Sequence, residues 1–179
     1  NEGFYHLLLQ ENRIAREAVP GQFVHLRVRD SLIPFLRRPF SLAGVSGKEG
    51  TLQFFFRVIG EGTKILSAIS KNQELDCLGP LGTGFRLSGG SGPVALLAGG
   101  LGVAPLLYLA QTLVSNQGEA ALFYGAASGS ELIPVEKFLP GEMQVYPVTE
   151  DGSIGYKGLV TEVFEEEIKK GFAPGEIFA

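Results

Sequence analysis

The segment Arg38-Pro39-Phe40-Ser41 combines a cation, an aromatic ring and a hydroxyl within four residues. An arginine guanidinium pairs well with a phosphate, and the ring and hydroxyl that follow it suit a flat ring system. The segment therefore predicts a site for a phosphorylated, aromatic ligand. Its alternative interpretation is an ordinary strand start with Arg38 on the surface.

A second candidate is Gly60-Glu61-Gly62-Thr63, at the expected start of a short helix. Free backbone N–H groups at such a start, with glycines that permit close approach, can hold a pyrophosphate. The alternative is a loop in which Thr63 caps the helix. Upstream, the run Phe-Phe-Phe-Arg at residues 54–57 alternates faces along a predicted strand, so half of its aromatic side chains are expected in the core.

A glycine turn at Gly99, Gly100 and Gly102 follows a predicted buried strand and precedes a helix with Pro105 in its first turn. It is not the six-residue dinucleotide fingerprint, because Pro105 stands where the third glycine belongs. It does place a helix start at the carboxyl edge of a parallel strand, where nucleotides bind in open sheets. The three glycines are therefore candidates for phosphate contacts, and a purely structural turn is the alternative.

The elements that must position these patterns fall into two regions. The first half has short runs rich in Phe, Val and Leu between Gly and Pro turns, which predicts an antiparallel barrel or sandwich with one helical insertion. The second half alternates strands and helices, which predicts a doubly wound parallel sheet. The expected strands are residues 4–10, 22–28, 39–44, 51–59, 74–78, 94–98, 121–124, 144–148 and 176–179, with helices at 63–70, after the glycine turn and at 159–170.

The boundary between the two regions is predicted at the Gly- and Ser-rich stretch 88–93, whose composition is typical of a domain joint. We therefore expect a barrel domain over residues 1–88 and an α/β domain over residues 93–179.

Composition excludes several classes of protein. The 179 residues are 45% apolar and 19% charged, which fits one or two folded domains. A formal net charge of −4 argues against a generally basic surface that binds nucleic acid. The single cysteine, Cys77, cannot form an intramolecular disulfide or a four-cysteine iron–sulfur site and is expected to be a small buried hydrophobe. A reduced, cytoplasmic compartment is the default.

The stretch from Leu87 to Gly118 carries no charged residue, and its length would suit a membrane helix. The glycine turn and Pro105 fall in its middle, so a buried strand, a turn and a packed helix explain it better, and no membrane span is expected. The sequence shows no nucleophile–base motif and no metal-spaced histidine pair. We therefore predict no catalytic side chain and no metal site, as in proteins whose cofactor does the chemistry.

Together the patterns resemble the ferredoxin–NADP reductase superfamily: a barrel with Arg-x-aromatic-Ser and Gly-x-Gly-Thr, then an α/β domain that opens with Gly-Gly-x-Gly-x-Ala-Pro. Within it, the sequence is most similar to the electron-transfer subunits of class B dihydroorotate dehydrogenases. Residues 78–85 resemble that group's connection between the domains, and residues 150–161 resemble its acidic-Asp-Gly-Ser-x-Gly-x-Lys-Gly-x-Val-Thr run. The resemblance covers almost the whole chain.

The resemblance implies a flavoprotein oxidoreductase that binds FAD in a groove between the two domains and takes NAD as its substrate nucleotide. It implies that electrons pass from a dihydroorotate-oxidising, FMN-containing catalytic subunit, in a heterotetramer, through a [2Fe–2S] cluster to FAD and then to NAD⁺, in pyrimidine biosynthesis. The residues implied for FAD are Arg38, Pro39, Phe40, Ser41, Phe55, Phe56, Arg57, Gly62 and Thr63, and those implied for the pyridine nucleotide are Gly99, Gly100 and Gly102.

The sequence departs from that family at its end. Family members continue with a Cys-Gly-Pro turn and four cluster cysteines, whereas this sequence stops at Ala179. We therefore expect a C-terminally truncated α/β domain, no cluster ligands in this chain and an incomplete nicotinamide site. Residues 127–130, after the second strand of the sheet, include no Arg or Lys, which favours NAD over NADP.

Two alternatives to this function stay open. One is a related NAD(P)H-linked ferredoxin or sulfide oxidoreductase subunit, which shares the barrel and the glycine turn. The other is a non-catalytic, nucleotide-binding scaffold that kept the fold and lost its electron path. The motifs do not distinguish the first alternative well from the dihydroorotate dehydrogenase function. A visible spectrum that shows no flavin, even after FAD is added, would favour the second.

Overall fold

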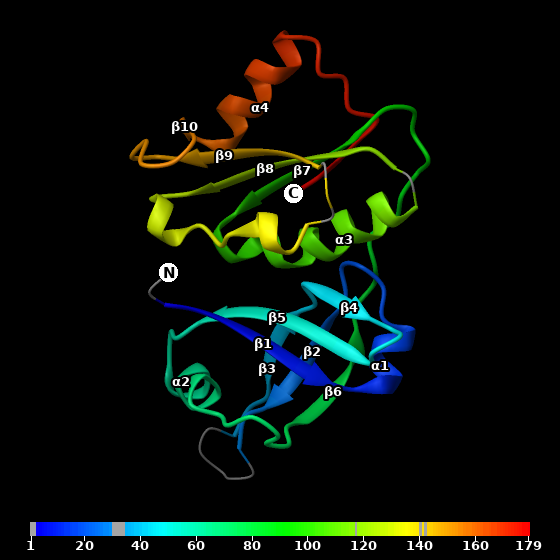
Figure 1. Ribbon diagram of the computed structural model, residues 1–179, viewed down its shortest axis with the longest axis vertical. Helices are drawn as coiled ribbons and strands as arrows, with labels where there is room; N and C mark the ends of the chain where they lie inside the picture. Colours follow the sequence, from blue (N-terminus) through cyan, green and yellow to red (C-terminus); the bar gives the residue numbers. More distant parts are fainter. Residues whose placement is uncertain (1–2, 30–34, 117, 140, 142) are drawn as a thin grey trace. The chain divides into compact units, whose positions relative to one another are not determined.

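The computed structural model describes residues 3–29, 35–116, 118–139, 141 and 143–179 (Figure 1). The chain forms two compact units that meet in the sequence between Gly84 and Phe85. Residues 88–93, where the sequence predicts the domain joint, belong to the second unit.

The first unit contains two three-stranded antiparallel sheets, in the orders β1-β5-β4 and β3-β2-β6. Apolar side chains that alternate along β2 and β5 form its core, where Val24, Leu26, Leu52 and Phe54 are fully buried. The elements are β1 (Phe4–Gln10), α1 (Asn12–Glu17), β2 (Phe23–Arg27), β3 (Arg38–Ser41), β4 (Gly44–Ser46), β5 (Thr51–Arg57), α2 (Glu61–Ser67) and β6 (Asp76–Leu81).

Residues 39–44, predicted as one strand, belong to two strands in different sheets, β3 and β4. Between these strands the backbone N–H of Leu42 donates to Gln22 at 3.1 Å, just before β2, whereas that of Ala43 donates to Gln53 of β5 at 2.9 Å. Both side chains are buried. The chain therefore changes sheets at this point, and only the distant bonding partners reveal the change.

The prediction of one helix in this half is also wrong, because the described residues contain α1 as well as α2. A six-residue helix is too short to show a helical apolar repeat. It is held instead by Glu11, whose carboxylate accepts the backbone N–H of Ile14, and by the burial of Ile14 and Ala15. Helix α2 begins at Glu61 and ends at Ser67, earlier at both ends than predicted.

The second unit is a five-stranded parallel sheet in the order β10-β9-β8-β7-β11. Helices α3 and α4 lie on opposite faces of it (Figure 1). The chain adds β8, β9 and β10 on one side of β7 and then returns to add β11 on the other, so the strand order reverses at β7. The elements are β7 (Val94–Gly99), η1 (Gly100–Gly102), α3 (Val103–Ser115), β8 (Ala120–Ala126), η2 (Gly129–Glu131), η3 (Val135–Lys137), β9 (Gln144–Thr149), β10 (Tyr156–Lys157), α4 (Val160–Lys169) and β11 (Glu176–Phe178).

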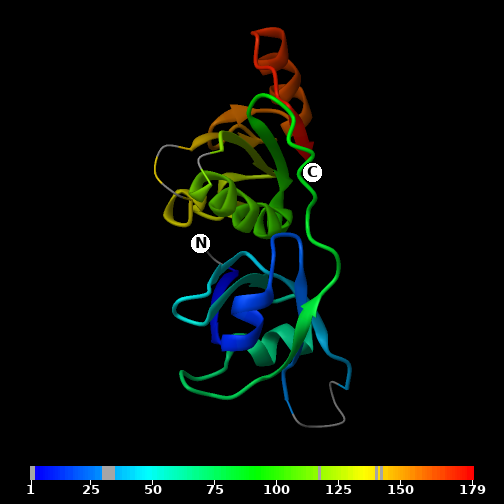
Figure 2. The same cartoon turned by 90° about the vertical axis from the view of Figure 1, so that its right-hand side faces the viewer.

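The segment that leads into β7 runs beside β11 (Figure 2). The backbone N–H and hydroxyl of Ser88 both donate to the carboxylate of Glu176. The ring of Phe85, which precedes Ser88, and the ring of Phe178, which follows Glu176, meet edge-on with their centroids 5.3 Å apart. These contacts fasten the last strand to the first part of the unit.

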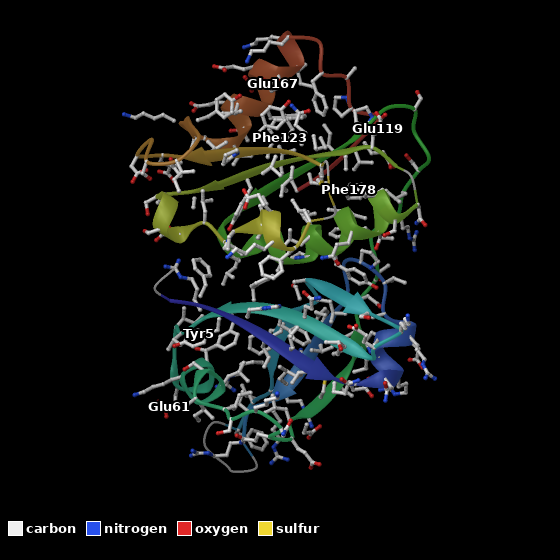
Figure 3. All side chains as sticks on the ribbon, in the orientation of Figure 1. Tyr5, Glu61, Glu119, Phe123, Glu167 and Phe178 are labelled. Atoms are coloured by element: carbon white, nitrogen blue, oxygen red, sulfur yellow. The ribbon has the colours of Figure 1, made fainter. Side chains whose placement is uncertain are left out.

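Phe123, in β8, is the centre of the sheet face that α4 covers (Figure 3). Its ring lies parallel to that of Tyr146 in β9, with the centroids 4.4 Å apart, and meets the ring of Phe164 in α4 edge-on at 5.2 Å. The ring of Phe172 lies 5.8 Å away, and Phe123 itself is fully buried. This aromatic cluster joins two strands to the last helix.

None of the helices in the part of the chain that the structure describes is long and apolar enough to cross a membrane. The uncharged stretch 87–118 instead supplies β7, the glycine turn and α3, as predicted. The apolar side chains of α3 are buried on the sheet face opposite α4.

Replacing the central ring tests the role of the aromatic cluster. We expect Phe123→Ala to lower the free energy of unfolding of the second unit by about 3–5 kcal/mol, the usual cost of truncating a buried phenylalanine. Urea unfolding followed by circular dichroism measures it. Ile168→Ala, which removes a 41% exposed side chain from the same helix layer, is the control and should cost about 1 kcal/mol or less. Similar losses in the two variants would contradict a central role for Phe123.

Candidate functional site

Arg38 and the start of α2, two of the sequence-predicted features, lie in contact. A Cβ atom added to Gly62 would be 2.5 Å from Nε and 3.0 Å from Cζ of Arg38, so the guanidinium rests directly on the glycine backbone. One of its nitrogens donates to the carbonyl of Leu36. A fixed positive charge beside backbone N–H groups suits a phosphate.

Thr63 is not the N-cap of α2, as it would be in the alternative interpretation of this segment. The N-cap is Gly60, and Thr63 is the third residue of α2. Its hydroxyl accepts the backbone N–H groups of Ile59 at 3.0 Å and Gly60 at 3.2 Å and donates to the carbonyl of Gly60 at 3.0 Å. The hydroxyl therefore fixes the turn on which Gly62 stands.

The Arg38–Ser41 segment presents two faces. Phe40 points inward, is 7% exposed, and packs edge-on against Phe54 and Phe56 with centroid distances of 6.4 and 5.9 Å. Pro39 and Ser41 lie on the opposite, exposed face of β3. The structure therefore does not bring Phe40 to the same surface as Ser41.

The outer face of β3 continues onto β2, which the sequence analysis did not assign to the site. His25 pairs with Pro39, and Phe23 pairs with Ser41. The rings of Phe23 and His25 lie 5.5 Å apart. The alternation of buried and outward residues along β2 is the sequence signal that could have placed these two rings beside the predicted segment.

The predicted aromatic residues of β5 pack against β1. Phe55 stacks on His6 and Phe56 on Tyr5, with ring centroids 4.9 and 5.1 Å apart. Burial lowers the pKa of His6, so its imidazole is held in the neutral form at this contact. Arg57 lies over the ring of Phe4, with its Cζ 4.9 Å from the centroid.

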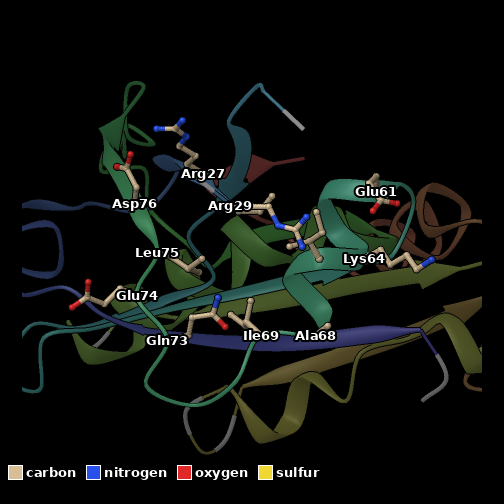
Figure 4. A pocket seen from close by; sticks show the side chains of 12 residues that line it. Arg27, Arg29, Glu61, Lys64, Ala68, Ile69, Gln73, Glu74, Leu75 and Asp76 are labelled. Carbon is tan, nitrogen blue, oxygen red and sulfur yellow. The ribbon is translucent and has the colours of Figure 1, made fainter. Parts of the chain in front are cut away.

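A cavity of about 750 Å³ lies alongside α2 in the first unit (Figure 4). None of the predicted site residues lines it, and the charged side chains among its described lining residues are balanced in sign, so these offer no net attraction to an anion. Those charged side chains are Arg27, Arg29 and Lys64 with Glu61, Glu74 and Asp76.

A second cavity, of about 590 Å³, lies at the carboxyl ends of β7 and β8 in the second unit. The strand order reverses at β7, and ligands of open parallel sheets bind at such a reversal. The cavity is lined by the ends of these strands, by the start of α4 and by two carboxylates. Its lining residues are Leu97, Ala98, Gly99, Gly100, Gly125, Ala126, Ala127, Glu131, Glu150, Gly158, Leu159, Val160, Thr161 and Ala179.

The predicted glycine turn forms one end of this cavity. A Cβ atom at Gly99, Gly100 or Gly102 would meet no atom within 4 Å, so the backbone of the turn faces open space. Gly100 has φ +51°, a conformation that favours glycine. No acidic or basic residue stands in the first turns of η1 and α3. The turn is therefore open to a phosphate approaching its N–H groups.

The opposite wall depends on a close approach between α4 and β8. A Cβ atom on Gly125 would lie 2.3 Å from a methyl group of Val160, so only glycine lets the helix start reach the strand end. The carboxylate of Glu162 accepts the backbone N–H of Leu159 at 2.8 Å. The helix start is thus already occupied by a side chain of its own.

The family-like run 150–161 folds into a loop against this wall. Asp151 accepts the backbone N–H of Ser153 at 2.9 Å and its hydroxyl at 2.5 Å, and these bonds lower the pKa of the Asp151 carboxyl. Ser153 also accepts the backbone N–H of Gly129 at 2.8 Å, which ties the loop to the segment after β8. The run therefore positions Glu150 and the start of α4 at the cavity.

Metal-ligating groups and the single thiol of the chain bear on what chemistry the described residues could do. Among the described residues, no group of three His, Cys, Asp or Glu could hold a metal ion. Burial raises the pKa of the half-buried Cys77 thiol to about 11, so it stays protonated at neutral pH.

No protein-family model matches the chain. It is 40% identical over 164 residues to the dihydroorotate dehydrogenase B (NAD(+)) electron transfer subunit of Desulforamulus reducens, covering 92% of this chain and 63% of that protein. It is 37% identical over 169 residues to the same subunit of Geobacillus thermodenitrificans, covering 93% and 65%. The chain is a homologue of these electron transfer subunits. The resemblance predicted from the sequence is confirmed.

Solved structures with the same fold are also found. A structure of NADH-dependent reduced ferredoxin–NADP oxidoreductase matches 94% of this chain and 60% of its own with a TM-score of 0.83 and 28% identity. A ferredoxin–NADP⁺ reductase from Neisseria gonorrhoeae, solved with FAD and NADP, matches 98% and 77% with a TM-score of 0.75 and 19% identity. The predicted order of an antiparallel barrel and a doubly wound parallel sheet is confirmed.

The chain spans less than two thirds of the length of the dihydroorotate dehydrogenase B subunits it matches. The twelve site residues predicted from that family lie in two places, nine in the first unit and three at the glycine turn of the second. Their contacts with a ligand stay a prediction.

The approach of α4 to β8 gives a test of the cavity wall in this homologue. We expect Gly125→Ala to lower the free energy of unfolding by about 1–3 kcal/mol, because the new methyl group must displace Val160 from a packed position. Gly99→Ala, which adds its methyl group to open space, is the matched control and should change stability by about 0.5 kcal/mol or less. Urea unfolding measures both. Equal effects would show that the close approach is not required.

Proposed function

We propose that this chain binds FAD with its first unit and NAD(H) with its second, and passes electrons between them as part of an electron transfer subunit. The observation that carries the proposal is the contact of Arg38 with Gly62, found in a homologue of the dihydroorotate dehydrogenase B electron transfer subunits. The N. gonorrhoeae reductase of the same fold, which was solved with FAD and NADP, supports it.

The first unit places a positive charge where the negatively charged diphosphate of FAD would bind. The guanidinium of Arg38 and the backbone of Gly62 would hold the diphosphate, and Thr63 would fix the turn beneath it. Pro39 and Ser41 would lie beside the flat ring system. Phe40, Phe55, Phe56 and Arg57 would hold these strands in place through their packing.

The second unit would bind the pyridine nucleotide in the cavity at the carboxyl ends of β7 and β8. The backbone of Gly99, Gly100 and Gly102 would hold its phosphates, because the turn faces open space. When bound, FAD would supply the redox chemistry by exchanging a hydride with the nicotinamide. The side chains of this protein would bind and orient the two groups.

The electron path and the partner are proposed by analogy with the relatives. We propose that the donor is a dihydroorotate-oxidising catalytic subunit containing FMN, assembled with this one in a heterotetramer. Electrons would reach FAD through a [2Fe–2S] cluster and leave to NAD⁺. The relatives' name, dihydroorotate dehydrogenase B (NAD(+)) electron transfer subunit, supports dihydroorotate as the electron source and NAD⁺ as the acceptor, whereas the FMN, the heterotetramer and the cluster are what the resemblance implies.

A second candidate is a subunit of an NAD(P)H-linked ferredoxin oxidoreductase. The TM-score of 0.83 to the NADH-dependent reduced ferredoxin–NADP oxidoreductase structure favours it. The identity of 28% to that structure is lower than the 40% to the D. reducens subunit, so the dihydroorotate dehydrogenase function is preferred.

A visible spectrum with nucleotide titration tests the proposal. After incubation with FAD and removal of the excess, the protein should show flavin absorbance, and anaerobic NADH should bleach it. Absence of a bound flavin would contradict the proposal and favour a scaffold. Bleaching of the FAD-loaded protein by reduced ferredoxin as well as by a reduced pyridine nucleotide would favour the second candidate.

Arg38→Ala tests the diphosphate contact. We expect FAD to bind about 10- to 100-fold more weakly, because a hydrogen bond to a charged group contributes roughly 1.5–3 kcal/mol. Gly62→Ala should give a related loss with little change in stability, because its methyl group comes closest to the end of the Arg38 side chain rather than to any backbone atom. Fluorescence titration of FAD measures both.

Arg37→Ala is the matched control for the loss of one positive charge. The guanidinium of Arg37 bonds the carboxylate of Asp76 and lowers its pKa, so it is engaged away from Gly62. Its FAD affinity should stay within about threefold of the unmodified protein. An equal loss in Arg37→Ala and Arg38→Ala would show a general charge effect and contradict the placement.

A further inference from the structure

The stretch 88–93, whose composition predicts a flexible joint, is held at both ends against the start of β11 (Figure 2). At one end, the backbone N–H and the hydroxyl of Ser88 donate to the carboxylate of Glu176. At the other end, the carbonyl of Pro93 accepts the backbone N–H of Gly175 at 3.0 Å. The stretch is therefore bonded to two consecutive residues of the second unit.

The backbones of the two segments touch between these bonds. A Cβ atom on Gly90 would lie 2.9 Å from the carbonyl oxygen of Gly175, and one on Gly92 would lie 2.9 Å from that of Ala173. A Cβ atom on Gly175 would in turn lie 2.5 Å from the carbonyl oxygen of Ser91. These distances are too short for any side chain, so glycine here permits close packing of two segments rather than free rotation.

The attachment begins at the first residue after the unit boundary. Phe85 follows the last residue of the first unit, and its ring meets that of Phe178, in β11, with the centroids 5.3 Å apart. Contacts along residues 85–93 thus run from a ring pair through hydrogen bonds to backbone packing. All of them are made with residues 173–178, and we call residues 85–93 the strap.

The residues that end the first unit are attached to that unit in a similar way. The side-chain amide of Gln22 donates to the carbonyl of Gly82 at 2.9 Å. A Cβ atom on Gly82 would lie 2.9 Å from the ring of Phe23, and one on Gly84 would lie 2.5 Å from a methyl group of Val19. The chain is therefore packed against the beginning of β2 and the turn before it as far as the unit boundary.

We propose that residues 85–93 are a fixed strap of the second unit, and that the link between Gly84 and Phe85 is the pivot about which the two units reorient. Because the chain is attached on each side of this link, a rotation elsewhere would have to break one of the contacts described above. Hinges are commonly a few such loop residues that absorb a change in φ and ψ, and glycine absorbs it most readily.

The proposal goes beyond the proposed function, because it concerns the chain without flavin or nucleotide. It also has a consequence for that function. A pivot of one link would restrict how a ligand on one unit approaches a ligand on the other far more than a flexible linker would.

NMR of the unmodified, isotope-labelled chain tests both parts. The backbone amides of residues 87–92 should have order parameters of about 0.85, as in rigid strands, whereas a flexible linker gives values below about 0.6. Residual dipolar couplings in a weakly aligning medium should require two alignment tensors, which change between Gly84 and Phe85. Low order parameters in the strap, or a change of tensor after Pro93 instead, would overturn the strap. A single tensor for both units would overturn the pivot.

Gly90→Ala tests the close packing, and Gly89→Ala is its matched control. Gly90 is not among the glycines with positive φ, so alanine there brings only the clash with the carbonyl of Gly175. Gly89 has φ +75°, so alanine there strains the backbone, but its methyl group would meet no atom within 4 Å. We expect the order parameters of the strap to fall below about 0.6 in Gly90→Ala and to stay near about 0.85 in Gly89→Ala. Equal values would contradict the role of close packing.

Circular dichroism establishes first that both variants fold. If Gly90→Ala does not, Glu176→Ala takes its place, because it removes the acceptor of both bonds from Ser88. The order parameter of the Ser88 amide should then fall below about 0.6. An unchanged value would show that this end of the strap is not held by Glu176.

Discussion

The reversal of strand order at β7 is the constraint on which the second unit depends. Because β8 and β11 pair on opposite sides of β7, the connections that leave the carboxyl ends of the strands diverge and open a space above the sheet. The glycine turn stands at the end of the central strand, so it faces that space. The cavity and its lining all follow from this topology.

Two close approaches at glycine give both candidate sites their shape. At Gly62, the missing side chain lets the guanidinium of Arg38 rest on the backbone of α2. At Gly125, it lets Val160 bring the start of α4 onto the end of β8. In each case the absence of a Cβ atom matters because of a neighbour from a distant part of the chain. Glycine here serves packing between elements rather than an unusual backbone angle.

The local charge differs between the two candidate sites. Only in the first unit is it opposite in sign to the net charge of the chain. The net charge is −4, yet the first unit holds a guanidinium at the helix start where an anion would bind. In the second unit the charged residues among the described lining of the cavity are acidic, and the backbone of the glycine turn faces open space with no charged side chain in its first turns. The two sites would therefore hold phosphates by different means, a fixed cation in one and oriented N–H groups in the other.

The sequence by itself determined the local features, since these depend on neighbouring residues. The alternating run of β1 was predicted with its observed bounds, Phe4–Gln10, and the buried strand, glycine turn and helix after Pro93 were placed correctly. The order of barrel and parallel sheet followed from the strand and helix patterns, and the resemblance to the family was carried by the motifs. The helical insertion at α2 was found, with its ends shifted.

Only the tertiary structure decided features that depend on distant partners. The sheet change at Leu42 and Ala43 is set by hydrogen bonds to Gln22 and Gln53, which no local pattern encodes. The inward direction of Phe40 depends on rings contributed by β5. The two carboxylates of the cavity come from segments that follow two different strands. These contacts form only when the strands pair, so their physical cause lies in the fold rather than in any short stretch of residues.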